Sequence, residues 1–240
     1  MLEVRHFSPA VFEAHRQAGD ALFNDRLASA DALFKRLGVT GISNNWHLQS
    51  AWKRSLGTFV YADLLEGKSN RRVLEIGGGL SGITMALATA NDFRLVELAT
   101  HEGEQDYRNI EQHLGRSFVT VGDWHTLPPP ESQDVVIAND LFPNVDQRLE
   151  WFLDKYLPIT KEMRLTLTYY ENTAWQVRRI SSGETLTVKP WGLREVTRVL
   201  DSVARDYGPY DRSQLVYECY EGTLFTNRRN ILFVRIIRSV

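Results

Sequence analysis

A glycine-rich turn between an apolar run and a helix-forming run constrains this chain more than any other feature. Residues 71–82 read RRVLEIGGGLSG, and residues 83–90 continue with apolar side chains that favour a helix. A strand, a glycine turn and a helix in this order let backbone N–H groups approach a nucleotide-like ligand at the helix start. The stretch therefore predicts an α/β fold with a ligand site at this turn.

The chain beyond the turn alternates between strand-like and helix-like segments, which is typical of a parallel sheet with crossover helices. The last two strand-like segments have no helix between them, so they are expected to form an antiparallel hairpin. The pattern predicts a doubly wound, Rossmann-like, seven-stranded sheet that is mostly parallel. The expected strands are residues 73–76, 93–98, 117–121, 134–138, 164–170, 214–220 and 230–237, and the expected helices are 82–90, 104–114, 145–157 and 190–207.

The segment before the turn has a different pattern. Apolar positions at helical spacing in residues 9–37 and 46–65 predict amphipathic helices. Residues 1–70 are therefore expected to form an N-terminal helical cap or lid, and residues 71–240 the catalytic domain. His47 lies at the start of the second helical run, where a lid helix can face a substrate.

Composition excludes several classes of protein. The formal net charge is −2 with charges of both signs interspersed, which disfavours nucleic acid as a partner. The single cysteine, Cys219, excludes an intramolecular disulfide and any multi-cysteine metal site. No apolar run approaches the roughly 20 residues that a membrane helix needs. These features favour a cytoplasmic protein that acts on a small molecule.

Ligands of a doubly wound sheet bind beyond the carboxyl ends of its strands. Glu97 ends the second strand, near the roughly 20-residue spacing at which an acidic side chain accepts both ribose hydroxyls. Asp123 follows the third strand and is placed to accept from an adenine amino group, while Trp124 can stack on the base. Asn139 and Asp140 follow the fourth strand, where a transferred group would meet its acceptor.

These motifs together resemble the motif series of class I S-adenosylmethionine-dependent methyltransferases. The resemblance covers residues 71–240 and includes the seven-strand order. It implies that Glu75 orients the turn and the methionine amino group, that the three glycines admit the carboxylate and ribose, that Glu97 holds the ribose, and that S-adenosylhomocysteine is the product. The glycines in question are Gly77, Gly78 and Gly79. One departure is Ser81, where the family commonly has a third glycine.

Two other functions remain open from the sequence. The same glycines satisfy the dinucleotide fingerprint of NAD(P)-dependent oxidoreductases. Glu75 argues against that class, because a carboxylate before the turn would repel a pyrophosphate but suits an ammonium and a sulfonium. A binding subunit that keeps the fold without catalysis is the third alternative.

Methyl transfer to a hydroxyl needs a group that removes the proton. The candidates for this base are Asp140, His47 and His125, in a protein whose acceptor is a small molecule such as a sugar or a secondary metabolite. Asp140 with Glu171 and Asn172 is also similar to the way divalent-metal-dependent O-methyltransferases hold magnesium. The sequence favours the reading in which these polar residues hold no ion.

Overall fold

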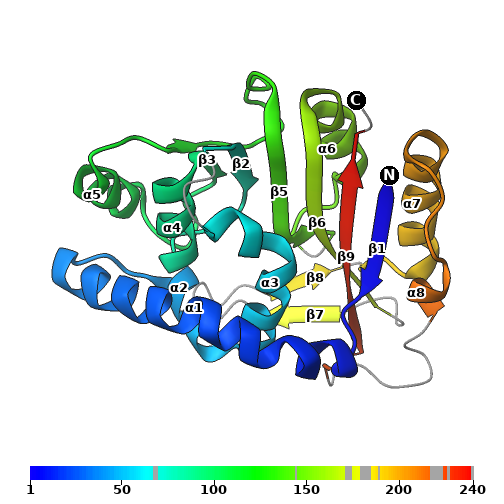
Figure 1. The fold of residues 1–240 in the computed structure, drawn as a ribbon, viewed down its shortest axis with the longest axis horizontal. Helices are drawn as coiled ribbons and strands as arrows, with labels where there is room; N and C mark the ends of the chain where they lie inside the picture. Colours follow the sequence, from blue (N-terminus) through cyan, green and yellow to red (C-terminus); the bar gives the residue numbers. More distant parts are fainter. Residues whose placement is uncertain are drawn as a thin grey trace.

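The computed structural model describes residues 1–66, 70–143, 145–170, 190–216, 224–225 and 228–238, and the backbone of two short strands at 175–178 and 185–188. A single seven-stranded sheet runs through the molecule, with helices on both faces (Figure 1). Among the described helices, none combines the length and the apolar character needed to cross a bilayer.

The strand order of the sheet is β1-β9-β6-β5-β2-β3-β4. Strands β2 to β6 pair in parallel, and β9 runs antiparallel to both of its neighbours, β6 and β1. The predicted doubly wound, mostly parallel sheet of seven strands is therefore confirmed. Its strands are β1 (Leu2–His6), β2 (Arg72–Ile76), β3 (Asp92–Glu97), β4 (Val119–Val121), β5 (Gln133–Phe142), β6 (Thr160–Tyr170) and β9 (Arg229–Ile237).

Helices cover both faces of the sheet in two layers. Leu74 and Ile76 of β2 share a core with α6 and α7, whereas Val73 shares a core with α1, α3, α4 and α5. Glu75 alternates with Leu74 and Ile76, so it points to the face that α3 covers. The helices are α1 (Pro9–Leu37), α2 (Ile42–Gln49), α3 (Ala51–Leu65), α4 (Gly82–Ala90), α5 (Glu104–Leu114), α6 (Leu149–Tyr156), a 3-10 turn η1 (Leu157–Ile159), α7 (Leu193–Tyr207) and α8 (Ser213–Val216).

The predicted closing hairpin is wrong, because the outer neighbour of β9 comes from the other end of the chain. Strand β1 pairs with β9 with Val4 opposite Val234. Alternate residues of β1, Leu2, Val4 and His6, are buried, which is the pattern of a strand with one face in the core. The predicted strand at 214–220 begins instead in the short helix α8, and its last residues, with Cys219, lie outside the described residues.

The predicted division at residue 70 also differs from the structure. Strand β1 belongs to the sheet, so the N-terminal segment is not wholly a cap. Helix α1 crosses the molecule from β1 to α4 and packs on α3 and α4, as the blue ribbon in Figure 1 shows. The polar segment between β6 and α7 contains the strands β7 (Trp175–Arg178) and β8 (Thr185–Val188), which pair with each other as a separate antiparallel sheet.

Candidate functional site

A cavity of about 870 Å³ lies at the carboxyl ends of β2, β3 and β5, beneath α2 and the start of α3. This is the edge at which ligands of a doubly wound sheet bind. The cavity brings together most of the residues that the sequence singled out. Its lining includes His47, Gly77, Gly78, Gly79, Glu97, Trp124, Asn139 and Asp140, whereas Asp123 and His125 do not line it.

The three glycines of the turn are needed for different reasons. Gly77 and Gly79 have φ values of 72° and 66°, in the left-handed region that favours glycine. A Cβ on Gly78 would lie 2.3 Å from the carboxyl carbon of Glu75, and a Cβ on Gly79 would lie 2.3 Å from the hydroxyl oxygen of Ser43. The turn therefore has a shape that only glycine allows, with its backbone against the cavity.

Ser81, the departure from the family pattern, is the N-cap of α4. Its hydroxyl accepts a hydrogen bond from the Thr84 N–H at 3.3 Å, and the Thr84 hydroxyl donates to the Gly79 carbonyl at 2.8 Å. The amide oxygen of Asn44 accepts from the Gly82 N–H at 3.0 Å. Side chains thus satisfy the free N–H groups that begin this helix and fix the turn to it.

Glu75 is buried directly beneath the turn, with only 2% of its surface exposed. The hydroxyl of Tyr61, on α3, donates to its carboxylate at 2.6 Å. Burial raises the pKa of Glu75 to about 7; the Tyr61 hydrogen bond opposes this rise and the nearby Glu97 adds to it. A positive charge placed at this turn would relieve the cost of keeping Glu75 ionised.

Two further carboxylates lie beside the turn. Glu97 accepts hydrogen bonds from the N–H groups of Gly79, at 3.3 Å, and Leu98, at 3.0 Å, and burial raises its pKa. Glu102 is buried and accepts from both the backbone and the hydroxyl of Ser43, at 2.6 and 3.0 Å. Sequence analysis missed Glu102, because its partner is 59 positions away and no local pattern marks it.

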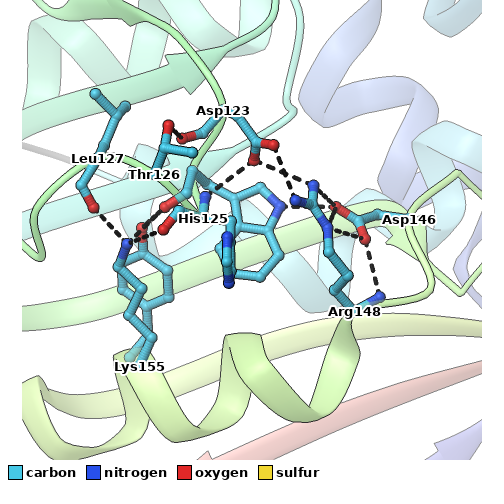
Figure 2. Close-up of polar contacts among 9 residues, drawn as sticks. Asp123, His125, Thr126, Leu127, Asp146, Arg148 and Lys155 are labelled. Carbon is cyan, nitrogen blue, oxygen red and sulfur yellow. Dashed lines mark hydrogen bonds and ion pairs between the residues drawn. The ribbon is translucent and has the colours of Figure 1, made fainter.

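Asp123 does not present a free carboxylate to the cavity. Figure 2 shows the Arg148 guanidinium between two carboxylates, donating to Asp123 at 2.8 and 3.1 Å and to Asp146 at 2.7 Å. The hydrogen bonds from Arg148 hold the pKa of Asp123 below its ordinary value. The predicted adenine contact by Asp123 therefore competes with an ion pair, and Arg148 is the residue of this cluster that lines the cavity.

The ring of Trp124 belongs mainly to the core. Only 4% of its surface is exposed, its ring centroid lies 5.4 Å from that of Phe152, and its indole N–H donates to Asp146 at 2.8 Å. Helix α6 and strand β5 enclose most of this ring, but Trp124 also lines the cavity, so its stacking on a base stays a prediction. His125 is exposed and packs against Trp151 at 5.0 Å, away from the cavity, so its predicted place near the acceptor is wrong.

The opposite end of the cavity contains Lys53, His47 and Asp140. The ammonium of Lys53, on α3, lies 2.7 Å from the carboxylate of Asp140, 87 positions along the chain, and this separation is why sequence analysis missed Lys53. Burial works to raise the pKa of Asp140, but the charges of Lys53 and Arg229 outweigh it and hold that pKa below its ordinary value. Burial, then the charge of Lys53, lowers the pKa of His47 to about 3.

A chain of hydrogen bonds joins the two ends. The Asp140 N–H donates to the Thr166 hydroxyl at 2.6 Å, and that hydroxyl donates to the Asn139 side chain at 2.9 Å. The Asn139 amide donates to the Tyr61 hydroxyl at 3.0 Å, which in turn donates to Glu75. Asn139 therefore connects the turn to Asp140, its neighbour in β5.

The structure describes only one of the three candidate metal ligands. Asp140 is described and paired with Lys53, whereas Glu171 and Asn172 lie outside the described residues. Within the described part of the chain, no group of three or more His, Cys, Asp or Glu side chains is arranged to hold a metal ion. The expectation that these residues hold no ion is not tested, and a metal site at them stays an alternative hypothesis.

Comparisons with known proteins support the fold. No protein-family model and no curated protein match the sequence. The N-terminal domain of EvdMO1, solved with SAH bound, is 16% identical, with a TM-score of 0.50 over 76% of this chain and 80% of that one. The DhpI–SAH complex is 15% identical over 95% of this chain and 98% of that one, with a TM-score of 0.48. The [4+2]-cyclase SpnF is 13% identical over 80% and 84%, with a TM-score of 0.49.

The likeness to EvdMO1 shows a shared fold, that of a Rossmann-like domain solved in a SAH complex. The cavity described above therefore lies in a fold that holds SAH in another protein, the N-terminal domain of EvdMO1. The roles of individual residues in this chain rest on their own geometry.

Proposed function

We propose that the protein transfers a methyl group from S-adenosylmethionine to an oxygen atom of a small molecule. The observation that carries this proposal is the pair of buried carboxylates, Glu75 and Glu97, beside a turn whose three glycines leave its backbone open to the cavity. Acidic groups whose pKa values burial raises favour a ligand that brings positive charge. S-adenosylmethionine carries an ammonium and a sulfonium.

The residues present fit this cofactor. Glu97 ends β3 at the cavity wall, where its carboxylate can accept from ribose hydroxyls. Gly77 and Gly79 line the same cavity, in left-handed conformations that favour glycine. Glu75 acts from beneath the turn, where it offsets the positive charge above it. When bound, the cofactor supplies a methyl carbon that its sulfonium already activates, so alignment of the acceptor can provide much of the rate.

A nicotinamide-dependent oxidoreductase is the main rival, because the turn also fits the dinucleotide fingerprint. The structure supports the argument against it. Glu75 lies in contact distance of the turn backbone at Gly78, where a pyrophosphate would bind, and Glu97 and Glu102 add further acidic groups nearby. These carboxylates would repel a ligand that brings two negative charges to the turn.

Calorimetric titration of the protein with S-adenosylmethionine, S-adenosylhomocysteine and NAD distinguishes these functions. We expect both sulfur ligands to bind with one site per chain and NAD not to bind. The variant Glu97→Gln should weaken S-adenosylhomocysteine binding by about tenfold or more, since hydrogen bonds to charged groups contribute about 1.5–3 kcal/mol. Glu104→Gln, an exposed residue whose carboxylate pairs with Arg108, is the matched control.

Failure of both sulfur ligands to bind would overturn the proposal. Binding of NAD alone would favour the oxidoreductase in its place. Binding of the sulfur ligands without turnover on any acceptor would favour the third alternative, a fold kept for binding. The acceptor shares a cavity of about 870 Å³ with the cofactor, which supports a small molecule such as a sugar or a secondary metabolite.

A further inference from the structure

Among the described residues, the acceptor end of the cavity, which we define by His47, Lys53 and Asp140, contains a cation but no base suited to an alcohol. An efficient general base has a pKa near the working pH. His47 has its pKa lowered to about 3, and Asp140 has its pKa lowered while it holds the Lys53 ammonium at 2.7 Å. The other cavity histidine, His101, packs edge-on against the Trp46 ring, at 4.7 Å, on the exposed loop after β3.

Positive charge gathers at the same end. The Lys53 ammonium lines the cavity and lies 5.0 Å from the centre of the Trp52 ring. The Arg229 guanidinium lies 4.8 Å from the same ring, outside the cavity lining, and its charge lowers the pKa of Asp140. Only Asp140 opposes these charges among the described side chains that line this end.

His47 adds a neutral polar group to this end. Its Nδ1 is buried and has no hydrogen-bond partner among the described residues. With its low pKa the imidazole is neutral at physiological pH, so it can donate a hydrogen bond from one ring nitrogen without adding charge. A buried polar atom without a hydrogen bond is energetically costly unless a ligand or a water molecule supplies that hydrogen bond.

Resting on the proposed methyl transfer, we propose that the acceptor is an organic oxygen acid that binds as its anion, with its ionised oxygen beside the Lys53 ammonium. The ionised oxygen uses a lone pair to form the new bond to the methyl carbon. The bond from that carbon to sulfur breaks with its electron pair on sulfur, so an anion and a sulfonium become two neutral groups. No proton is left over, and the site needs no base.

Each residue then has a defined part. Lys53 binds the anion, and His47 provides a neutral hydrogen-bonding group beside it. Asp140 is a positioning residue, because it contacts Lys53 and is itself fixed by the Thr166 hydroxyl through its backbone N–H at 2.6 Å. Carboxylates and phosphonates share the required chemistry, and the experiment separates them.

The first test is binding to the protein saturated with S-adenosylhomocysteine. Benzoate and phenylphosphonate represent the two oxygen acids, and benzyl alcohol and methyl glucoside represent neutral hydroxyl compounds. We expect at least one anion to bind and to lose about tenfold or more in affinity in Lys53→Gln, with Lys53→Arg recovering part of it. Lys161→Gln is the matched control, because Lys161 also pairs with an aspartate, Asp134, but is exposed and outside the cavity.

The second test is a proton count on every acceptor that turns over. In weakly buffered solution with a pH indicator, at a pH at which the acid is fully ionised, methylation of the anion releases no proton, whereas methylation of an alcohol releases one per turnover. We expect no release. One proton per turnover, binding of the neutral compounds but neither anion, or unchanged anion affinity in Lys53→Gln would each overturn the inference.

Failure of this inference is distinguishable from failure of the proposed function. S-adenosylhomocysteine is titrated first, without any acceptor. If it does not bind, methyl transfer itself is refuted. If it binds and neither anion does, the cofactor assignment stands and the acceptor assignment falls.

Discussion

The two ends of the cavity are built in opposite ways. The donor end, the turn with Glu75, Gly77, Gly78 and Gly79, is one continuous stretch whose backbone forms the surface. The acceptor end assembles side chains from α2, α3 and the end of β5, with Lys53 and Asp140 separated by 87 positions. A site made of backbone leaves a local signature in the sequence, whereas a site made of distant side chains does not.

The two ends also differ in charge. Buried carboxylates surround the turn, whereas the Lys53 ammonium lines the other end and Arg229 lies behind it, near Trp52. Tyr61 connects the two ends, because its hydroxyl donates a hydrogen bond to Glu75 and accepts one from the Asn139 side-chain amide. The difference in charge suits a cationic donor and an anionic acceptor in one cavity.

The largest expected effect is on the free energy of unfolding, and it tests whether Trp124, beside the donor end, is a structural residue. Trp124→Ala should lower the free energy of unfolding by about 3–5 kcal/mol, because it removes a large buried ring from the core. Trp151→Ala, at a residue that is 57% exposed, should change the free energy of unfolding by less than about 1 kcal/mol. Urea unfolding measures both. A stable Trp124→Ala that binds S-adenosylhomocysteine poorly would make this ring a ligand contact and break the comparison.

The stability of the protein is expected to depend on pH through Glu75, at the donor end of the cavity. The pKa of Glu75 is raised from its ordinary value of 4.5 to about 7 in the folded chain. Between pH 4.5 and about 7 the folded chain therefore holds a proton that the unfolded chain has released. Stability should therefore fall as pH rises from about 4.5 to about 7, by on the order of 3 kcal/mol.

The measurement is urea unfolding of the ligand-free protein across that pH range. Glu75→Gln should flatten this part of the profile, and Glu104→Gln should leave it unchanged. Equal profiles for the wild-type chain and Glu75→Gln would mean that the buried acid titrates normally.

Gly78→Ala tests whether the donor end depends on its backbone. The new Cβ would lie 2.3 Å from the Glu75 carboxyl carbon, so the turn or the carboxylate must move. We expect S-adenosylhomocysteine affinity to fall by about 100-fold, about 2.7 kcal/mol. Gly103→Ala is the control, because its φ is −71° and a Cβ there meets nothing within 4 Å. Normal affinity in Gly78→Ala would show that the close approach is dispensable.

The smallest expected effect belongs to Asp123. Because its carboxylate is held by Arg148, Asp123→Asn should weaken S-adenosylhomocysteine binding by less than about threefold, in keeping with the small energy of solvent-accessible ion pairs. Asp134→Asn, at an ion pair outside the cavity, serves as the reference. A loss above about tenfold, seen by calorimetry, would restore Asp123 as an adenine contact and place a side-chain contact in the donor end.

Sequence patterns predicted the parallel part of the fold well, because apolar alternation and glycine turns are local properties. The strand at residues 73–76 differs from β2 by one residue at its start, and the helix at 104–114 has the bounds of α5. The edge of the sheet was predicted wrongly, because β1 is short and its partner β9 is at the opposite end of the chain. Nothing in the first few residues indicates where they pair.

The candidate site divides in the same way. The glycines, Glu75 and Glu97 were found from their spacing along the chain, and they lie together around the turn. Lys53 and Glu102 were missed, because each meets its partner only after distant segments pack. His125 was placed wrongly and the burial of Trp124 was not expected, because exposure on a loop and packing against α6 depend on the tertiary structure.

By itself the sequence determined the strand–turn–helix unit at residues 72–90 and the parallel sheet around it, since backbone conformation and side-chain alternation are set by neighbouring residues. Only the tertiary structure decided that Asp123 pairs with Arg148, that Lys53 meets Asp140, and that Tyr61 reaches Glu75. These contacts depend on how helices dock on the sheet. That docking is set by packing over the whole molecule, and packing fixes the charge at each end of the cavity.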